Sequence, residues 1–275
     1  MTKKIIYDLG SNNGDDIPYY LKKADLVVAV EANPSLCVDI ERRFSSEIRE
    51  RKLFVESCVL TPDDSKPEVF FYLHKRDHVY SQFPKPDEAI IEEFEKKLLP
   101  SKSISSLIEK YGDPYYIKID IEHYEAAILE ALFRSNIRPP FISAESHSID
   151  VFAILVASGS YNSFKLVDGH TVSKKFKNLS ISVGGRREIY SFPYHSAGPF
   201  GEDVPGEWMS ANNFFRLLAY EQLGWKDIHA TNQVLPNLSL IPSLRPYVKR
   251  AIKRKVMHKF PFMRKFWRND EEDSL

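Results

Sequence analysis

The chain is 275 residues long, 43% of them hydrophobic and 28% charged, and its 38 basic residues equal its 38 acidic ones. No window approaches 18 consecutive apolar residues, which excludes a membrane-spanning helix of the usual kind. The first strand starts directly after MTKK, leaving no room for a signal peptide, and two cysteines make no disulfide framework. We therefore expect a cytoplasmic protein with one large α/β domain and reduced thiols.

The charge is unevenly distributed along the chain. Residues 245–268 hold ten lysines or arginines, several aromatic residues and no acid, whereas residues 1–244 hold 28 basic residues against 34 acids. We predict a mildly acidic domain over residues 1–244 and a basic aromatic tail over residues 245–275. Such a tail is typical of a segment that contacts anionic lipid, which would place the protein peripherally at the inner face of a membrane. A solvated extension, or one docked on the acidic body, explains it equally well.

Residues 5–14, IIYDLGSNNG, predict a buried strand followed by a glycine turn and a helix. The next strand, LVVAVE, ends at Glu31, which lies 21 residues after Gly10. A carboxylate about 20 residues beyond such a turn is placed to bind the hydroxyl pair of a ribose. The spacing favours an adenosine ligand, although the glycines could also serve only to make the turn.

The same loop indicates which adenosine ligand to expect. Its pattern is G-x-x-x-G, without the dinucleotide fingerprint G-x-G-x-x-G, and no G-x-x-x-x-G-K-[ST] occurs in the chain. Asp15 and Asp16 open the following helix and would repel a phosphate there. S-adenosylmethionine carries a sulfonium and an ammonium group. We predict that Asp8, Asn12 and the loop amides hold its amino-acid end, while Glu31 holds its ribose.

A third strand, LFVES, ends at Ser57 and Cys58, which would flank the adenine or simply be small residues at a crowded strand end. VFFYL predicts an added strand. Residues 74–102, rich in charge and proline with one short helical run, predict an insertion over the mouth of the active site. His74, His78 and Tyr80 lie within it, and a lone histidine in a polar loop is more often a surface residue than a ligand. SISSLIEKYG then predicts a helix capped by Gly112.

Acids and histidines follow two further predicted strands. YYIKID ends at Asp120 and is followed by Glu122 and His123, and FISAES carries Glu145 and is followed by His147. Because the carboxyl ends of parallel strands meet at one edge of a sheet, these side chains should lie together. Clustered carboxylates are costly unless they are solvated, paired or used, so the arrangement predicts a catalytic cleft.

The strands FKLVDG and REIYSFP would complete a Rossmann-like, mostly parallel sheet of seven strands with helices on both faces. Residues 193–210, PYHSAGPFGEDVPGEWMS, are rich in proline, glycine and aromatic residues, as functional lids often are. We predict that four side chains of this lid bind the acceptor: His195, Glu202, Asp203 and Trp208.

Four segments in order, DLGSNNGDD, VVAVEANP, YIKIDIEHYE and ISAESH, resemble the FkbM family of S-adenosylmethionine-dependent methyltransferases over about residues 1–170. The resemblance implies a Rossmann-like sheet with one antiparallel strand and O-methylation of a sugar or macrolide hydroxyl. Carried over by position, the acids on the acceptor side are Asp120, Glu122 and Glu145. The cofactor motif is matched by Asp8, Gly10, Asn12, Gly14 and Glu31, to which we add Ser11, Ala32, Ser57, Cys58 and Asp120.

One position departs from the family, which usually has Glu-Gly where this chain has Glu122-His123. Methyl transfer requires the acceptor oxygen in line with the methyl carbon and removal of the hydroxyl proton. His147 and His123 are both candidates to accept that proton at neutral pH. Carboxylates suit Mg²⁺, so Asp120, Glu122 and Glu145 could hold it, but nothing in the sequence requires a metal.

We therefore expect an S-adenosylmethionine-dependent O-methyltransferase that acts on a hydroxyl of a sugar or glycan, such as a polysaccharide or a lipid-linked oligosaccharide. One alternative is a methyltransferase of nucleic acid, using the basic tail on phosphates, or of another small molecule. The acidic body and the lack of an N-P-P-[YF] motif argue against nucleic acid. Another alternative is an inactive binding module on the same fold, against which the intact Asp8, Asn12 and Glu31 argue.

Overall fold

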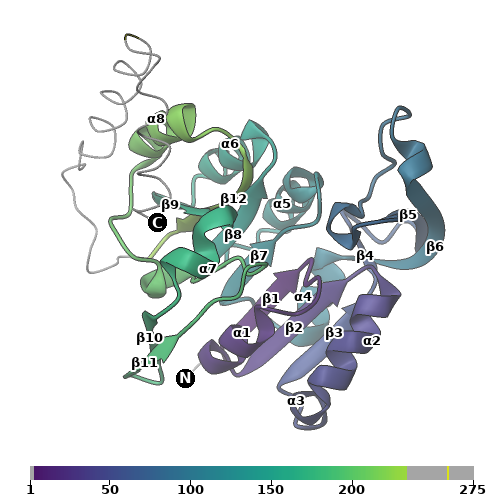
Figure 1. Cartoon of the computed structure of the whole chain (residues 1–275), viewed down its shortest axis with the longest axis horizontal. Helices are drawn as coiled ribbons and strands as arrows, with labels where there is room; N and C mark the ends of the chain where they lie inside the picture. The colour runs from purple at the N-terminus through teal and green to yellow at the C-terminus, as the bar shows by residue number, and fades with distance from the viewer. Residues whose placement is uncertain (1–2, 234–258, 260–275) are drawn as a thin grey trace.

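The structure is a computed structural model and describes residues 3–233 and Lys259. Its centre is a seven-stranded sheet in the order β3-β2-β1-β7-β8-β12-β9, in which β12 runs antiparallel to both neighbours (Figure 1). This confirms the predicted Rossmann-like, mostly parallel sheet. Its strands are β1 (Ile5–Leu9), β2 (Leu26–Glu31), β3 (Leu53–Ser57), β7 (Tyr116–Ile119), β8 (Phe141–Ser146), β9 (Ser163–Asp168) and β12 (Gly224–Thr231).

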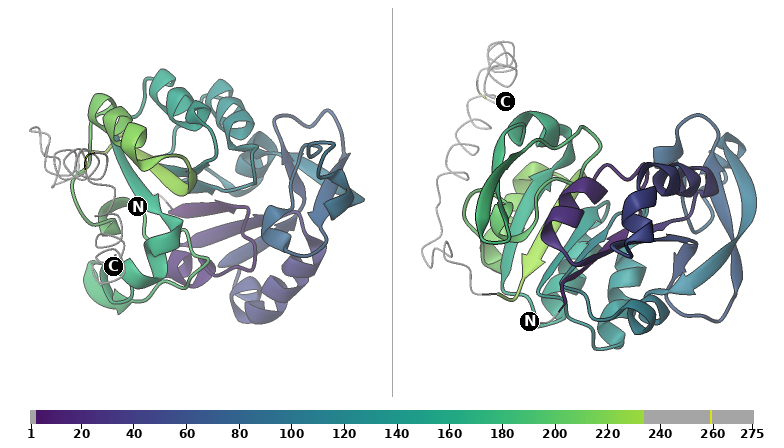
Figure 2. Two further views of the ribbon diagram at one scale, coloured as in Figure 1. Left: turned by 45° about the horizontal axis from the view of Figure 1, so that its top comes forward. Right: turned by 90° about the horizontal axis from the view of Figure 1, so that it is seen from below.

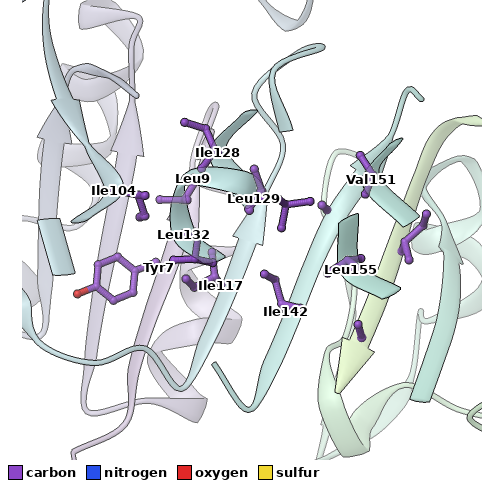
Figure 3. Close-up of a cluster of buried hydrophobic side chains, with 14 of the residues drawn as sticks. Tyr7, Leu9, Ile104, Ile117, Ile128, Leu129, Leu132, Ile142, Val151 and Leu155 are labelled. Atoms are coloured by element: carbon purple, nitrogen blue, oxygen red, sulfur yellow. The ribbon is translucent and has the colours of Figure 1, made fainter. Parts of the chain in front are cut away.

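One face of the sheet is covered by four helices. Side chains alternate along each strand, so Tyr7 and Leu9 of β1 point to this face while Ile6 points to the other. Figure 3 shows the apolar layer that results, in which Ile117 and Ile142 of the strands meet residues from the helices. The helices are α4 (Ile104–Tyr111), α5 (Glu125–Arg134), α6 (Ile149–Ala157) and α8 (Ala211–Glu221).

The opposite face packs against α1 (Ile17–Lys23), α2 (Pro34–Arg43), α3 (Ser45–Arg49) and the short α7 (Val172–Lys175). This second core is rich in aromatic residues. Phe200 stacks on Tyr116 of β7 with the ring centroids 4.0 Å apart and the planes 5° from parallel. Phe200 belongs to the segment predicted as a lid, so part of that segment is core.

Local sequence signals set the helix limits. The Asn33 side chain accepts a hydrogen bond from the amide of Ser35 at the start of α2, directly before Pro34. Ser103 caps α4 in the same way through the amide of Ser106. Gly112, with φ of +109°, ends α4 as predicted.

The seventh strand of the sheet is not the one predicted. REIYSFP does not join the main sheet, because β11 (Arg186–Tyr190) pairs with β10 (Leu179–Val183) in a separate hairpin. The place is taken by β12, which lies between β8 and β9 and buries the polar side chains of Asp227 and His229. The sequence did not predict β12, because its buried polar residues break the run of apolar residues that indicates a buried strand.

Residues 74–102 also differ from prediction, because they contain a long strand in place of an α-helical run. A small three-stranded sheet, with the order β4-β6-β5, projects beside the carboxyl end of β3 (Figure 2). VFFYL is part of β5, as predicted. The elements are β4 (Val59–Thr61), β5 (Glu68–His74), β6 (Phe94–Ser103) and the 3₁₀ turns η1 (His78–Tyr80) and η2 (Ile91–Glu93).

Among residues 3–233, no helix is long and apolar enough to cross a bilayer. The predicted basic tail of residues 245–275, and with it the membrane contact predicted for residues 245–268, lies outside the described residues apart from Lys259.

Candidate active site

A cavity of about 580 Å³ opens at the carboxyl ends of β1, β2, β7 and β8. This is the edge at which ligands bind in open parallel sheets. The small sheet and η1 contribute to one side of the cavity, and the start of β12 contributes to another. The predicted site residues that line it are Gly10, Asn12, Glu31, Ala32, Cys58, Asp120, Glu122, Glu145, His147 and His195.

Gly10 allows β1 and β7 to end close together. It has φ of +80°, and a Cβ atom built on it would lie 1.7 Å from the carbonyl oxygen of Asp120. The Asp120 amide donates a hydrogen bond to the carbonyl of Leu9, so the pairing of β1 with β7 holds the Asp120 backbone against Gly10. No residue other than glycine fits this turn without moving backbone.

Glu31 is held rigidly at the end of β2. Its two carboxylate oxygens accept hydrogen bonds from the amides of Asn12, at 2.8 Å, and Asn33, at 2.7 Å. Burial raises the pKa of Glu31 to about 7, although these two amides act in the opposite direction. The predicted ribose-binding carboxylate is thus fixed against the glycine loop by backbone amides of the protein itself.

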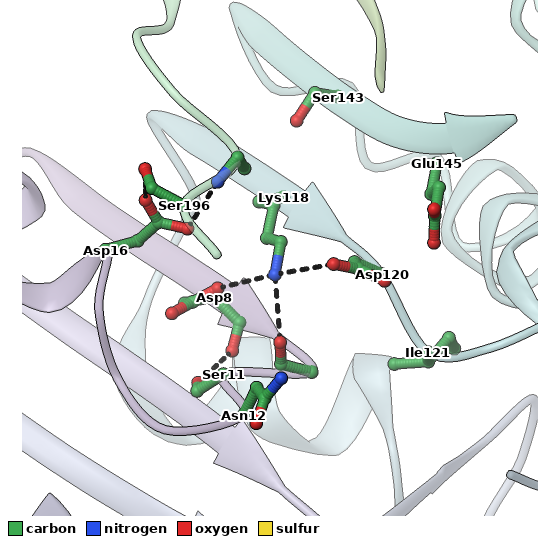
Figure 4. A network of polar contacts seen from close by, with 12 residues as sticks. Asp8, Ser11, Asn12, Asp16, Lys118, Asp120, Ile121, Ser143, Glu145 and Ser196 are labelled. Carbon is green, nitrogen blue, oxygen red and sulfur yellow. Dashed lines mark hydrogen bonds and ion pairs between the residues drawn. The ribbon is translucent and has the colours of Figure 1, made fainter. Parts of the chain in front are cut away.

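Lys118 lies beneath the loop and was not predicted as part of the site. Its ammonium is 3.5 Å from Asp8, 3.2 Å from Asp120 and 2.9 Å from the carbonyl of Gly10 (Figure 4). Burial lowers the pKa of Lys118, but the carboxylates of Asp120 and Asp8 raise it well above its usual range. The signal was present in the sequence, since a lysine inside the apolar strand YYIKID must be paired if it is buried.

Lys118 also determines what its partners do. Burial opposes ionisation of Asp120, but the ammonium holds the pKa of that carboxyl below its usual range. Asp8 is 1% exposed and does not line the cavity, so the structure places it as the support of Lys118, away from the cofactor contact that we predicted.

An acid–histidine cluster, formed by Glu122, Glu145 and His147, lies where β7 and β8 end. His147 Nε2 is 2.8 Å from Glu145 Oε2 and 3.4 Å from Glu122 Oε2. Burial lowers the pKa of His147, but the two carboxylates outweigh it and raise the pKa. Burial and the neighbouring Asp120 raise the pKa of Glu145. The cluster therefore retains a proton to a higher pH than an isolated imidazole would.

His123 stands beside this cluster, with its ring 4.2 Å from that of His147, but it does not line the cavity. Burial and the charge of His147 lower its pKa. Glu122 and His123 both have left-handed backbone conformations, with φ of +50° and +68°. The second is the position where the family usually has glycine, so the histidine is accommodated at the cost of backbone strain.

Several predicted site residues lie elsewhere. Ser11 and Gly14 are buried in the turn, where Gly14 packs on Ile17 and Ile40, and Ser57 is exposed outside the cavity. Asp16, one of the two acids expected to repel a phosphate at the start of α1, does not line the cavity. That side chain is buried and accepts hydrogen bonds from Ser196 and from the amide of Ala197.

Two of the four residues of the segment 193–210 that we predicted to bind the acceptor are buried and cannot contact it. Asp203 is buried and accepts hydrogen bonds from Tyr19 and Lys23, and Trp208 is 4% exposed in the core. Both serve packing of this segment on α1 and the sheet. Glu202 is exposed and does not line the cavity, whereas His195 does.

The cavity includes side chains that sequence analysis missed. Lysine and arginine are absent from its lining within the described residues, while five acids and four histidines are present. His78, expected to be a surface residue, lines one side together with Tyr80. Further lining residues not predicted are Leu36, Val59, Leu60, Phe71, Phe83, His170, Tyr194 and Trp225.

The sheet order and the cleft at its carboxyl edge define a Rossmann-like α/β protein that binds a ligand at the ends of its parallel strands. The methyltransferase FkbM domain matches residues 8–163, more than half of the chain, and the chain therefore belongs to the FkbM methyltransferase family. Methyltransferases of this fold generally use S-adenosylmethionine. No curated protein matches the sequence significantly.

Solved structures with similar folds include methyltransferase FkbM from Methylobacillus flagellatus KT. It is 17% identical with a TM-score of 0.41, and the match covers 61% of this chain and 40% of that one. The chain thus spans less than half of that protein. Precorrin-6Y C5,15-methyltransferase from Geobacter metallireducens GS-15 is 11% identical with a TM-score of 0.37, and the match covers 84% and 80% of the two chains.

Proposed function

We propose that the chain transfers the methyl group of S-adenosylmethionine to a hydroxyl of a sugar or glycan. The observation that carries the proposal is the junction, in one cavity, of the glycine turn and Glu31 with the acid–histidine cluster. The half of the cavity at the glycine turn and Glu31 offers groups suited to an adenosine. The half at the acid–histidine cluster offers a base, His147, held by carboxylates. A hydroxyl needs such a base because it must lose its proton as it is methylated.

The residues present fit S-adenosylmethionine. The Asn12 Oδ1 atom is buried without a hydrogen-bond partner and Asn12 lines the cavity, so it can accept a bond from the ammonium group. Glu31 lines the same space with a carboxylate that can still accept bonds from ribose hydroxyls. Leu36 and Val59 give the apolar surroundings that an adenine ring requires. The cofactor supplies an electrophilic methyl group on a good leaving group.

The protein then has to orient the acceptor and take its proton. We assign proton acceptance to the deprotonated form of His147, with Glu122 and Glu145 stabilising the imidazolium that forms. Because these carboxylates also raise the pKa of His147, the proton-accepting form becomes more abundant as the pH rises. His147 lines the cavity and His123 does not, which favours the former as the base. Asp120, kept ionised by Lys118, lies at the boundary between the two halves and is placed to support the cationic cofactor.

A nucleic-acid acceptor is less well supported. Phosphate-bearing substrates are bound through lysine and arginine, neither of which lines the cavity in the described part of the chain. An acceptor without phosphate near the reacting hydroxyl agrees better with this lining.

Calorimetric titration with S-adenosylmethionine, NAD and ATP tests the cofactor. We expect selective binding of the methyl donor, weakened by Glu31→Ala but unchanged by Glu93→Gln, which alters a carboxylate outside the cavity. Failure to bind S-adenosylmethionine by folded protein would overturn the proposal.

Transfer of isotope-labelled methyl groups to a panel of glycans and matched amines tests the reaction. We expect O-methyl products, and a rate reduced about 100-fold or more by His147→Asn. Methylation of amines only, or full activity of His147→Asn, would contradict the assignment of an O-methyltransferase that uses this base.

A further inference from the structure

The four side chains His170, Tyr194, His195 and Trp225 form one side of the cavity, which we name the aromatic wall. His170 and Tyr194 contact Trp225 edge to face, with ring centroids 4.7 and 5.3 Å apart. His195 lies at 30° to the indole plane, with its centroid 6.3 Å away. These residues come from three separated segments of the chain, so the wall exists only in the folded protein.

The fold holds Trp225 at this place by two features. The pairing of β12 with β8 shifts register between Gly224, opposite Ser146, and Asp227, opposite Glu145. Such bulges re-aim side chains next to active sites. In addition, a Cβ atom built on Gly169 would lie 2.4 Å from the Trp225 Nε1 atom, so the indole rests directly on the backbone of Gly169.

The register also places the wall next to the acid–histidine cluster. Glu145 belongs to the cluster and is opposite Asp227, two residues after Trp225, in the paired strands. His147 directly follows the end of β8. A molecule in contact with Trp225 is therefore on the β12 side of the proposed base.

The wall is not simply part of the hydrophobic core. Tyr194 is 51% exposed, His170 and His195 are exposed, and Trp225 is partly exposed. Aromatic side chains of this size gain from burial, and a ligand in the cavity can supply it. One face of a pyranose ring consists of C–H groups that pack well on an aromatic ring, while its hydroxyls can bond to carboxylates at the rim.

The charge of the cavity lining limits which acceptors can bind beside the aromatic wall. Five carboxylic acids line it, namely Glu31, Asp77, Asp120, Glu122 and Glu145, whereas no lysine or arginine of the described residues does. Lys118 pairs with Asp120 from beneath the glycine loop, outside the lining. A carboxylate or phosphate on the acceptor would be repelled here, because like charges in a cleft of low dielectric constant interact strongly.

We propose that the aromatic wall, centred on Trp225, is the subsite that receives the acceptor ring, and that the cavity selects uncharged pyranosides over those carrying a carboxylate or phosphate. The proposal rests on the proposed function, because it assigns the acceptor half of the same cavity. In this subsite Trp225 binds and selects the acceptor and takes no part in proton transfer.

The test is saturation-transfer NMR of the full-length protein with saturating S-adenosylhomocysteine. The probes are methyl glucopyranoside and methyl rhamnopyranoside as neutral sugars, with glucuronate and glucose 6-phosphate as anionic ones. We expect saturation of the neutral sugars only, and binding about tenfold weaker in Trp225→Ala. Trp225→Leu keeps an apolar side chain of intermediate size without the ring face and should be equally impaired, and it replaces the alanine variant if that one does not fold. Phe215→Ala, which removes an exposed aromatic residue outside the cavity, should bind as the unmodified protein does.

The outcomes separate this proposal from the proposed function. If S-adenosylmethionine binds but no pyranoside is saturated, or the Trp225 variants bind neutral sugars unchanged, the subsite is wrong while the cofactor assignment stands. If the anionic sugars bind as well as the neutral ones, the proposed selection is wrong. If S-adenosylmethionine itself does not bind, it is the proposed function that fails.

Discussion

Replacing Glu145 by glutamine is expected to lower the pKa of His147. The two side chains are 2.8 Å apart, and the substitution removes the charge while keeping an oxygen that can accept a hydrogen bond. At this separation a charge pair contributes roughly 1.5 to 6 kcal/mol for effective dielectric constants between about 80 and 20. This corresponds to a fall of about one to four pKa units. Glu122, 3.4 Å away, remains and keeps part of the elevation.

The pKa can be measured without knowledge of the acceptor. The ring carbon-bound proton of His147 is followed by NMR as a function of pH and is assigned by its absence in His147→Gln. Glu93→Gln is the matched control, because it breaks a similar pair with His74, 3.2 Å apart, outside the cavity. An unchanged titration midpoint in Glu145→Gln would refute the reasoning, as would an equal shift in Glu93→Gln.

Three further predictions concern the turn, the strained loop and the tail. Gly10→Ala should lower the free energy of unfolding by about 3 kcal/mol or more, because the new Cβ would meet the Asp120 carbonyl. Gly185 also has a positive φ, of +82°, but open space around it, so Gly185→Ala should lower the free energy of unfolding by only about 1 kcal/mol. Equal losses for the two variants in urea denaturation would contradict the steric argument. His123→Gly removes a side chain from a backbone with φ of +68° and should raise the free energy of unfolding by up to about 1 kcal/mol, so that a clear loss in the same assay would show that the histidine makes stabilising contacts. Deleting residues 245–275 removes ten cationic side chains and should reduce sedimentation with vesicles that contain anionic lipid, while unchanged partitioning would exclude the tail as a membrane contact.

The parts of the site that could be predicted from the sequence are those fixed by local pattern. A strand, a glycine turn and a carboxylate at the end of the next strand define their own geometry, so Gly10 and Glu31 were placed correctly in the cavity. The same holds for Glu122, Glu145 and His147, because parallel strands that carry them end at one edge.

The remaining features depend on contacts between distant segments. Asp203 looks like a binding residue in a polar loop, yet its partners Tyr19 and Lys23 lie some 180 positions earlier in the chain. Trp225 enters the cavity because a bulge and the bare backbone of Gly169 direct it there. No periodicity in the sequence encodes either arrangement, since each is decided by tertiary packing.

The position of β12 has a consequence for how the protein is made. Among the strands of the described residues β9 pairs with β12 alone, so this edge of the sheet cannot join the rest until residues 224–231 have left the ribosome. The glycine turn, Glu31 and the strands β1, β2, β3, β7 and β8 are all synthesised earlier and can assemble first. Trp225 arrives with β12, so the nascent chain can build its cofactor half before it acquires the wall on the acceptor side.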